Sequence, residues 1–143
     1  MDESQVVKIV DNINQYVDRL PWCDFEVLEY RGTRLVVTGS LDVSAAHTFE
    51  VWFDGVFFVS LPMGWKTDTS RPPLALMVGE GAAAVNRRFR VERGHHIFRF
   101  TPEDYPEDFG CLVGAREIGF VAIDPQRAAS DVQSRGPASP GSG

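Results

Sequence analysis

The hydrophobic residues between positions 4 and 20 recur every three or four residues, which is the repeat of one face of an α-helix. They are Val6, Ile9, Val10, Ile13, Tyr16, Val17 and Leu20, with mostly polar residues between them. Ser4 can supply a capping oxygen, and Pro21 disfavours helical geometry at the residue before it. We therefore predict an amphipathic helix over 4–20. Because its polar face is not rich in Lys and Arg, we expect its apolar face to pack on a sheet rather than on a membrane.

From Phe25 onward the repeat of hydrophobic residues falls to two, as expected for strands that bury one face. The pair Asp54-Gly55 favours a two-residue hairpin between strands at 47–53 and 56–61. Short connections leave no room for a parallel return between strands. We therefore expect the four sequential strands of this region to form an antiparallel meander.

The pattern changes again after residue 61. Residues 62–73 contain three prolines and a glycine, and we predict that they form a long loop. A strand is predicted at 74–78, then a short helical turn near 81–86 and a second hairpin that joins 88–93 to 96–101. An acidic loop follows, after which one or two strands within 111–123 complete the sheet.

Together these segments predict an α+β fold. We expect an N-terminal amphipathic helix packed on a mostly antiparallel β-sheet of about seven or eight strands, curled or folded into a partly open sandwich. Residues 1–127 are assigned to a single domain, because a domain of this length buries enough surface for its own core. Residues 128–143 are dominated by Ala, Ser, Gly and Pro, a composition that predicts a disordered tail.

Charge is the compositional feature that changes this picture. The 143 residues include 20 Asp and Glu against 14 Lys and Arg, a formal net charge of −6. A nucleic-acid-binding domain usually offers an excess of Lys and Arg to phosphates, so we expect no nucleic-acid partner. The excess is uneven: residues 1–60 and 103–143 are acidic, whereas residues 61–102 are basic. Such a division favours an interface with another protein that is guided by charge.

The sequence offers no motif typical of a metal centre, a cofactor site or a catalytic site. The two cysteines, Cys23 and Cys111, do not form a disulfide framework or a metal motif, so we expect buried free thiols. The three histidines, His47 among them, match no zinc spacing. The GxGxxA string at 79–84 lacks the βαβ context of a dinucleotide site. Neither a secretory leader nor an apolar run that spans a membrane is visible, which predicts a cytoplasmic protein with no membrane partner.

The segment TPEDYPEDFG, residues 101–110, is the leading candidate for a binding site. Its prolines stiffen the backbone, which lowers the entropy lost on docking, and its tyrosine is a typical interface anchor. We expect this loop and a tryptophan of the loop at 62–73 to bind a partner protein. The candidate contacts are Glu103, Asp104, Tyr105, Glu107, Asp108 and Trp65. A solvated loop without a binding role has the same composition, and Trp65 is instead buried if the sheet forms a sandwich.

A second set of residues favours a different function, in which the curled sheet holds a small ligand or substrate in a pocket. If residues 88–101 form a hairpin, its arginines share an outward face that can hold phosphate or another acidic ligand. The candidate ligand contacts are Arg88, Arg90, Arg99, His95 and His96. A solvated face of cross-strand pairs produces the same pattern.

The stretch from Asp24 to Pro62, DFEVLEYRGTRLVVTGSLDVSAAHTFEVWFDGVFFVSLP, resembles the β-meander of small bacterial immunity-type proteins that are encoded with toxins. The resemblance rests on a general pattern that covers about a quarter of the chain, and it assigns no functional residue. It implies a non-catalytic, acidic protein-binding module that neutralises a basic toxin domain by direct binding. Whether the protein is a monomer or a homodimer is left open by the sequence.

Overall fold

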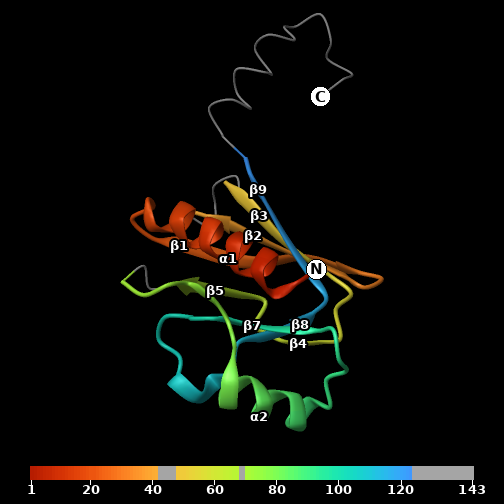
Figure 1. Cartoon of the computed structure of the whole chain (residues 1–143). Coiled ribbons are helices and arrows are strands. Elements are labelled where there is room, and N and C mark those ends of the chain that lie inside the picture. The colour runs from red at the N-terminus through yellow and green to blue at the C-terminus, as the bar shows by residue number, and fades with distance from the viewer. Residues whose placement is uncertain (42–47, 68–69, 124–143) are drawn as a thin grey trace, which may run out of the picture.

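The computed structural model describes residues 1–41, 48–67 and 70–123, and these ranges contain two α-helices, a 3-10 helix and nine strands (Figure 1). The elements are α1 (Glu3–Asp18), β1 (Cys23–Arg31), β2 (Arg34–Ser40), β3 (Phe49–Asp54), β4 (Phe58–Ser60), β5 (Gly64–Thr67), β6 (Leu74–Leu76), α2 (Gly79–Phe89), β7 (His96–Phe100), η1 (Glu107–Phe109), β8 (Leu112–Ala115) and β9 (Glu117–Ala122). The predicted tail and His47 lie outside the described residues.

The strands form two antiparallel sheets that face each other. Sheet A has the strand order β5-β1-β2-β3-β9, and sheet B has the order β4-β8-β7-β6. The two sheets and α1 enclose one core, in which Phe25 and Phe53 of sheet A pack against Phe100 and Phe98 of sheet B. The predicted α+β fold with mostly antiparallel strands is therefore confirmed. The described residues form nine strands in two sheets, where about seven or eight were expected.

Helix α1 lies on the inner face of sheet A, beside sheet B (Figure 1). Its predicted apolar face is confirmed by the burial of Val6, Val10, Ile13 and Val17. The predicted cap at Ser4 is wrong, because the capping oxygen belongs to Asp2. Asp2 Oδ1 accepts the Gln5 N–H at 2.9 Å, and Gln5 Oε1 accepts the Asp2 N–H at 3.0 Å. This capping box pairs two amides that the start of a helix otherwise leaves free.

Helix α1 also covers an edge of sheet B. The Nδ2 group of Asn14 donates to the Leu74 carbonyl oxygen at 2.8 Å, and its Oδ1 accepts the Leu74 N–H at 3.2 Å. A side-chain amide thus replaces the backbone of a further strand next to β6. Because an edge strand presents unpaired backbone groups, this contact fixes where the helix sits on the sheet.

The predicted hairpin at Asp54-Gly55 is wrong. Gly55 has the left-handed backbone that this pair favours, with φ of 61°, but the strands on its two sides belong to different sheets. Strand β3 pairs with β2 and β9 in sheet A, whereas β4 pairs with β8 in sheet B. The turn therefore carries the chain from one sheet to the other, and the predicted meander is limited to β1, β2 and β3.

Two further predictions between residues 62 and 101 are wrong. The predicted loop at 62–73 contains β5, which pairs with β1 at the edge of sheet A. The predicted strand at 88–93 is absent, because the short helical turn extends into α2 and ends at Arg90, whose φ is 54°. Three consecutive alanines lie in this helix, and alanine favours helix more strongly than any other residue. Strand β7 pairs instead with β6 and β8.

Helix α2 lies outside sheet B, on the side away from α1 (Figure 1). Its Phe89 ring stacks on Phe58 of β4, with the ring centroids 4.2 Å apart. Phe58 lies over Gly114, where a Cβ atom would come within 2.6 Å of the phenyl ring. No residue of α2 is fully buried, so the helix is attached to the surface of the sandwich. No helix in the described ranges is long and apolar enough to cross a lipid bilayer.

Candidate functional site

The acidic loop predicted from the sequence connects β7 to β8 and is held against strand β5. The Glu103 N–H donates to the Lys66 carbonyl oxygen at 2.7 Å, and the Thr67 hydroxyl donates to the Thr101 carbonyl oxygen at 3.0 Å. The 3-10 helix η1 then ends the loop before β8. These bonds give the loop a defined backbone, which is the property that its two prolines suggested.

Two aromatic side chains lie together on this loop. The rings of Tyr105 and Phe109 have centroids 4.4 Å apart, and the two residues are 39% and 40% exposed. Glu103, Asp104 and Asp108 are exposed on the same loop, while the side chain of Glu107 lies outside the description. The sequence-based prediction missed Phe109, which lies four positions after Tyr105. Side chains at this spacing can meet where the chain turns as in a helix.

Trp65 is not part of this surface, which corrects the sequence-based assignment. It lies on β5 and is 5% exposed. Its indole stacks on Phe25 at 5.5 Å and meets Phe100 edge-on at 5.0 Å. The alternative arrangement, burial inside a sandwich, is the one that the structure shows.

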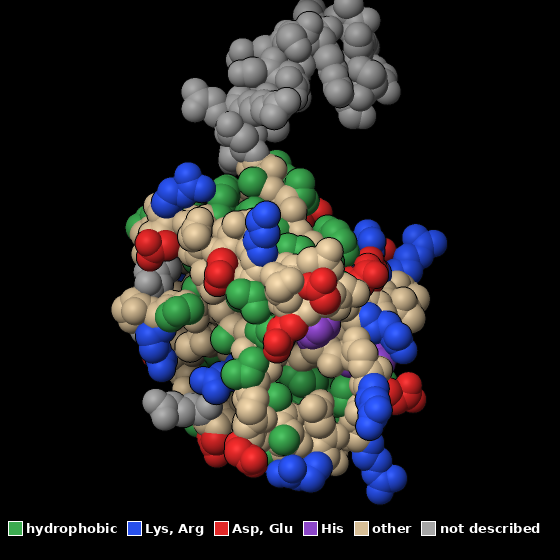
Figure 2. Space-filling model, viewed as in Figure 1, with side chains coloured by type: hydrophobic (Ala, Val, Ile, Leu, Met, Phe, Trp, Pro, Cys, Tyr) green, Lys and Arg blue, Asp and Glu red, His purple; other side chains and the backbone are tan. Residues whose placement is uncertain are grey.

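The arginines proposed as ligand contacts do not share one strand face. Arg88 and Arg90 lie at the C-terminal end of α2, whereas Arg99 lies on β7 opposite Ala75 of β6. Figure 2 shows that Lys and Arg side chains gather at the lower right of the molecule, near the end of α2. The predicted row fails because residues 88–93 do not form a strand.

The two described histidines are held apart by different backbone contacts. His95 Nδ1 lies 2.9 Å from the Glu92 carbonyl oxygen, and His96 Nε2 lies 3.0 Å from the Met1 carbonyl oxygen. Within the described ranges, no three His, Cys, Asp or Glu side chains lie close enough together to hold a metal ion.

The two cysteines are buried and free, as expected from the sequence. Burial raises the pKa of the Cys23 and Cys111 thiols to about 12. Near neutral pH both groups are therefore protonated thiols, whereas nucleophilic catalysis by cysteine requires the thiolate. Their position in the core gives them a packing role.

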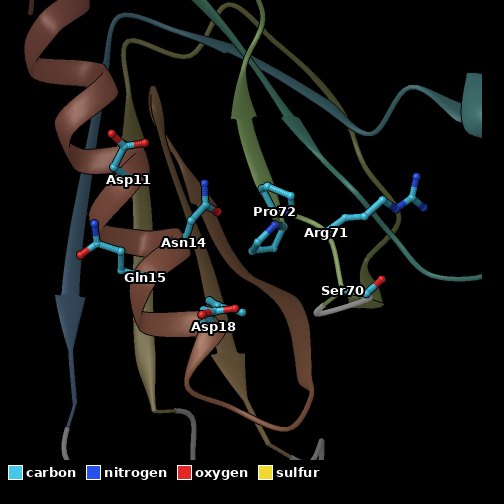
Figure 3. A pocket seen from close by; sticks show the side chains of 9 residues that line it. Asp11, Asn14, Gln15, Asp18, Ser70, Arg71 and Pro72 are labelled. Carbon is cyan, nitrogen blue, oxygen red and sulfur yellow. The ribbon is translucent and has the colours of Figure 1, made fainter.

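A groove of about 370 Å³ separates α1 from residues 70–73 (Figure 3). Asp11, Asn14 and Asp18 lie on its helix side, and Pro72 lies across from them. This groove lies at the surface beside α1 and not between the two sheets. Between the sheets, the space is filled by the core side chains.

A second groove, of about 420 Å³, brings two arginines together. Arg71 points away from α1 in Figure 3 and shares this groove with Arg99. Ala75 and Met77 contribute to its apolar lining. Arg71 was missed because it is distant in sequence from Arg99 and the pairing of β6 with β7 brings the two segments together.

The face of sheet A that points away from the core is a third surface. The Trp52 indole covers Gly119, where an added Cβ atom would fall 1.7 Å from the ring. The Arg34 guanidinium lies 4.8 Å from the ring centroid and donates two bonds of 2.7 Å to Asp54. These bonds lower the pKa of the Asp54 carboxyl group. Glu26, like much of the rest of this face, is exposed.

Neither a protein-family model, nor a curated protein, nor a solved structure matches this chain. What the chain does must therefore be inferred from its own surfaces.

Proposed function

We propose that this chain is a non-catalytic, acidic binding module that docks onto a basic surface of another protein. The observation that carries the proposal is the exposed pair Tyr105 and Phe109 on a loop whose backbone is tied to β5. An ordered loop loses little entropy on docking, and paired aromatic rings offer apolar area in one place. The carboxylates of the same loop favour approach by a basic partner and disfavour acidic ones.

The resemblance of residues 24–62 to immunity-type proteins supplies the biological setting of this proposal. The partner would be a basic toxin domain, and the protein would neutralise it in the bacterial cytoplasm by covering its surface. Charge attraction would speed association, and burial of the aromatic pair would slow dissociation. The high thiol pKa values and the separated histidines support a role that needs no chemistry.

Co-purification with the product of the neighbouring reading frame tests the partner, and variants of the loop test the surface. Changing Tyr105→Ala together with Phe109→Ala is expected to weaken the complex at least about 30-fold, because an aromatic hot spot contributes about 2 kcal/mol or more. Changing Glu103→Gln, Asp104→Asn and Asp108→Asn is expected to slow association at low salt. Asparagine suits position 104, since φ there is 65° and asparagine adopts this backbone readily.

The matched control changes charge elsewhere on the surface. Asp11→Asn with Asp18→Asn removes two exposed carboxylates from α1, and affinity should stay unchanged. If the loop variants bind as tightly as the unmodified protein, the loop is not the interface. Failure of the neighbouring product to co-purify at low and moderate salt would contradict the toxin assignment.

The groove that contains Arg71 and Arg99 supports a second candidate function, binding of a small anionic ligand with an apolar part. A thermal-shift screen of carboxylates and phosphates tests it. A ligand present at about 100 times its dissociation constant should stabilise the fold by about 2.7 kcal/mol. This gain should disappear in Arg71→Gln and Arg99→Gln. A screen without a stabilising compound removes this candidate.

A further inference from the structure

A groove of about 480 Å³ lies at the edge of sheet A, where β5 pairs with β1. In this pairing Glu26 lies opposite Gly64, and Asp24 lies opposite Lys66. Because side chains alternate between the faces of a strand, these four positions share the face that points away from the core. Gly64 has no side chain, so the space across from Glu26 is open.

Asp24 is the unusual residue among those that line this groove. It is 6% exposed, and its Oδ1 atom has no hydrogen-bond partner in the part of the chain that the structure describes. Lys66 lies across the pairing, yet no ion pair joins the two within that part. A buried carboxylate oxygen without a hydrogen-bond donor is unfavourable, and an approaching donor group relieves it. Two acidic residues, Asp24 and Glu26, and one basic residue, Lys66, line the groove, so acidic groups are in excess there.

The chemistry of the groove fits an arginine side chain. The exposed Glu26 carboxylate is available to a guanidinium group, and Met63, which is 71% exposed, can pack against the methylene groups of an incoming side chain. The missing side chain at Gly64 lets a flat group approach the backbone. Arginine presents several donors in a fixed planar fork and can reach two acceptors at once, whereas lysine acts as a point charge.

We propose that this groove binds an arginine side chain of the partner protein, an inference that rests on the proposed function. The groove and the acidic loop are neighbours, because Lys66 lines the groove and its carbonyl oxygen accepts the Glu103 N–H. A single basic surface can therefore contact the loop on one side of β5 and place an arginine in the groove on the other side.

A capped tetra-arginine peptide is the probe for this proposal, and a capped tetra-citrulline peptide is its neutral control of similar shape. Each peptide is titrated into ¹⁵N-labelled protein while the backbone amide signals are followed by NMR. The arginine peptide is expected to shift the Gly64 amide, and the citrulline peptide is expected to leave it unchanged. The difference isolates the charge of the guanidinium group.

Three variants locate the binding. Glu26→Gln removes the exposed charge, Gly64→Val fills the groove, and each should raise the dissociation constant of the arginine peptide at least about tenfold. A Cβ atom at Gly64 would have the Phe25 carbonyl oxygen as its nearest neighbour, at 3.4 Å, so the fold has room for a side chain. Glu29→Gln removes another exposed charge from the same strand, outside the groove lining, and should leave the dissociation constant unchanged.

A fourth variant separates binding from folding. Asp24→Asn keeps the shape of the side chain, and we expect it to weaken peptide binding without lowering Tm, because the native Oδ1 atom has no hydrogen-bond partner in the described fold. Unchanged binding of the arginine peptide to Glu26→Gln and Gly64→Val overturns the groove proposal, and so does the absence of any shift at Gly64. If shifts centre on Tyr105 and Phe109 instead, the groove is excluded while the loop remains the interface. If the groove binds the peptide but no neighbouring product co-purifies, the toxin assignment fails and the groove stands.

Discussion

The two helices of this protein differ in how firmly they are attached. Helix α1 buries four residues in the core, begins with a capping box and binds the edge of β6 through Asn14. Helix α2 buries no residue completely, has Val78 at its N-cap without a side-chain hydrogen bond, and ends at a left-handed Arg90. Its ring contact with the sandwich is the stack of Phe89 on Phe58. A helix in this fold can therefore be part of the core or an addition to its surface.

The same contrast applies to the charged surfaces beside the two helices. Helix α1 lies in the acidic part of the chain, and the end of α2 lies in the basic part. The firm packing of α1 keeps the acidic side chains on its outer side in one arrangement. The arginines at the end of α2 belong to a helix that buries no residue completely. Separation of α2 from sheet B should therefore cost less free energy than separation of α1 from the core.

Removal of apolar side chains beneath the two helices should give the largest difference in the free energy of unfolding. Ile13→Ala removes a fully buried side chain of α1 and is expected to lower the free energy of unfolding by about 2–5 kcal/mol. Val85→Ala changes a half-buried residue of α2 and is expected to lower it by about 0.5 kcal/mol. Urea unfolding followed by circular dichroism measures both values. Equal losses would mean that α2 belongs to the core.

The contact between α1 and β6 should give the second largest effect. Asn14→Ala leaves the Leu74 N–H and carbonyl groups without their partner. Because partly buried backbone groups are costly to leave unpaired, we expect a loss of about 1–3 kcal/mol in the free energy of unfolding. Gln15→Ala, at an exposed position on the same helix, is the control and should cost little. A loss at Asn14 no larger than at Gln15 would show that the side-chain amide does not hold the helix to the sheet.

Removal of the aromatic stack tests the attachment of α2. Phe89→Ala is expected to lower the free energy of unfolding by about 1 kcal/mol, because the stack is at the surface and the ring is half-buried. Hydrogen exchange of the α2 amides should accelerate, while exchange in β7 and β8 stays slow. Arg87→Ala serves as the control at an exposed position of the helix. If β7 and β8 lose protection to the same extent as α2, the helix and sheet B unfold as one unit.

The difference between the helices also explains what the sequence could predict. The hydrophobic repeat that identifies α1 fits a helix along its whole length of 16 residues, and the burial of its apolar face agrees with that repeat. Residues 81–93 combine alanines that favour helix with alternating arginines that suggest a strand, so local preference alone does not decide between them. The turn at Asp54-Gly55 has the same local chemistry whether the next strand pairs with its neighbour or crosses to the other sheet. That choice depends on β9, which joins β3 from far along the chain.

For the candidate sites, the sequence indicated the continuous loop but not the grooves. The acidic loop is one continuous segment, so its composition reveals it. The grooves need tertiary pairing: Glu26 faces Gly64 across β1 and β5, and β5 was hidden inside a segment that its prolines identified as a loop. Trp65 was misassigned for the same reason. A position in a loop implied an exposed side chain, whereas on β5 the side chain is buried.

The smallest expected effect concerns the caps at the starts of the two helices. The backbone N–H of Gln5 and the hydroxyl group of Ser4 lower the pKa of Asp2 below its ordinary value of 3.8. A carboxyl group whose pKa is lower in the folded state stabilises the fold above its unfolded pKa, and this contribution is lost as the pH falls through the folded value. Asp2→Asn keeps a capping oxygen without the titration, so the stability difference between the two proteins should be constant near pH 6 and change below pH 3.8.

The opposite change, addition of a cap, can be made in α2. Val78→Ser supplies the capping oxygen that this N-cap lacks, and the added hydrogen bond should slow hydrogen exchange of the first amides of α2 at all pH values. The Asp2 variant and the Val78 variant together separate two causes of the contrast between the helices. If Val78→Ser slows exchange throughout α2 to the level of α1, its weak attachment is a matter of capping. We expect instead that exchange slows in the first turn alone, because an N-cap pairs the first amides of a helix and adds no packing to the others. The difference in attachment between α1 and α2 would then follow from how much of each helix is buried.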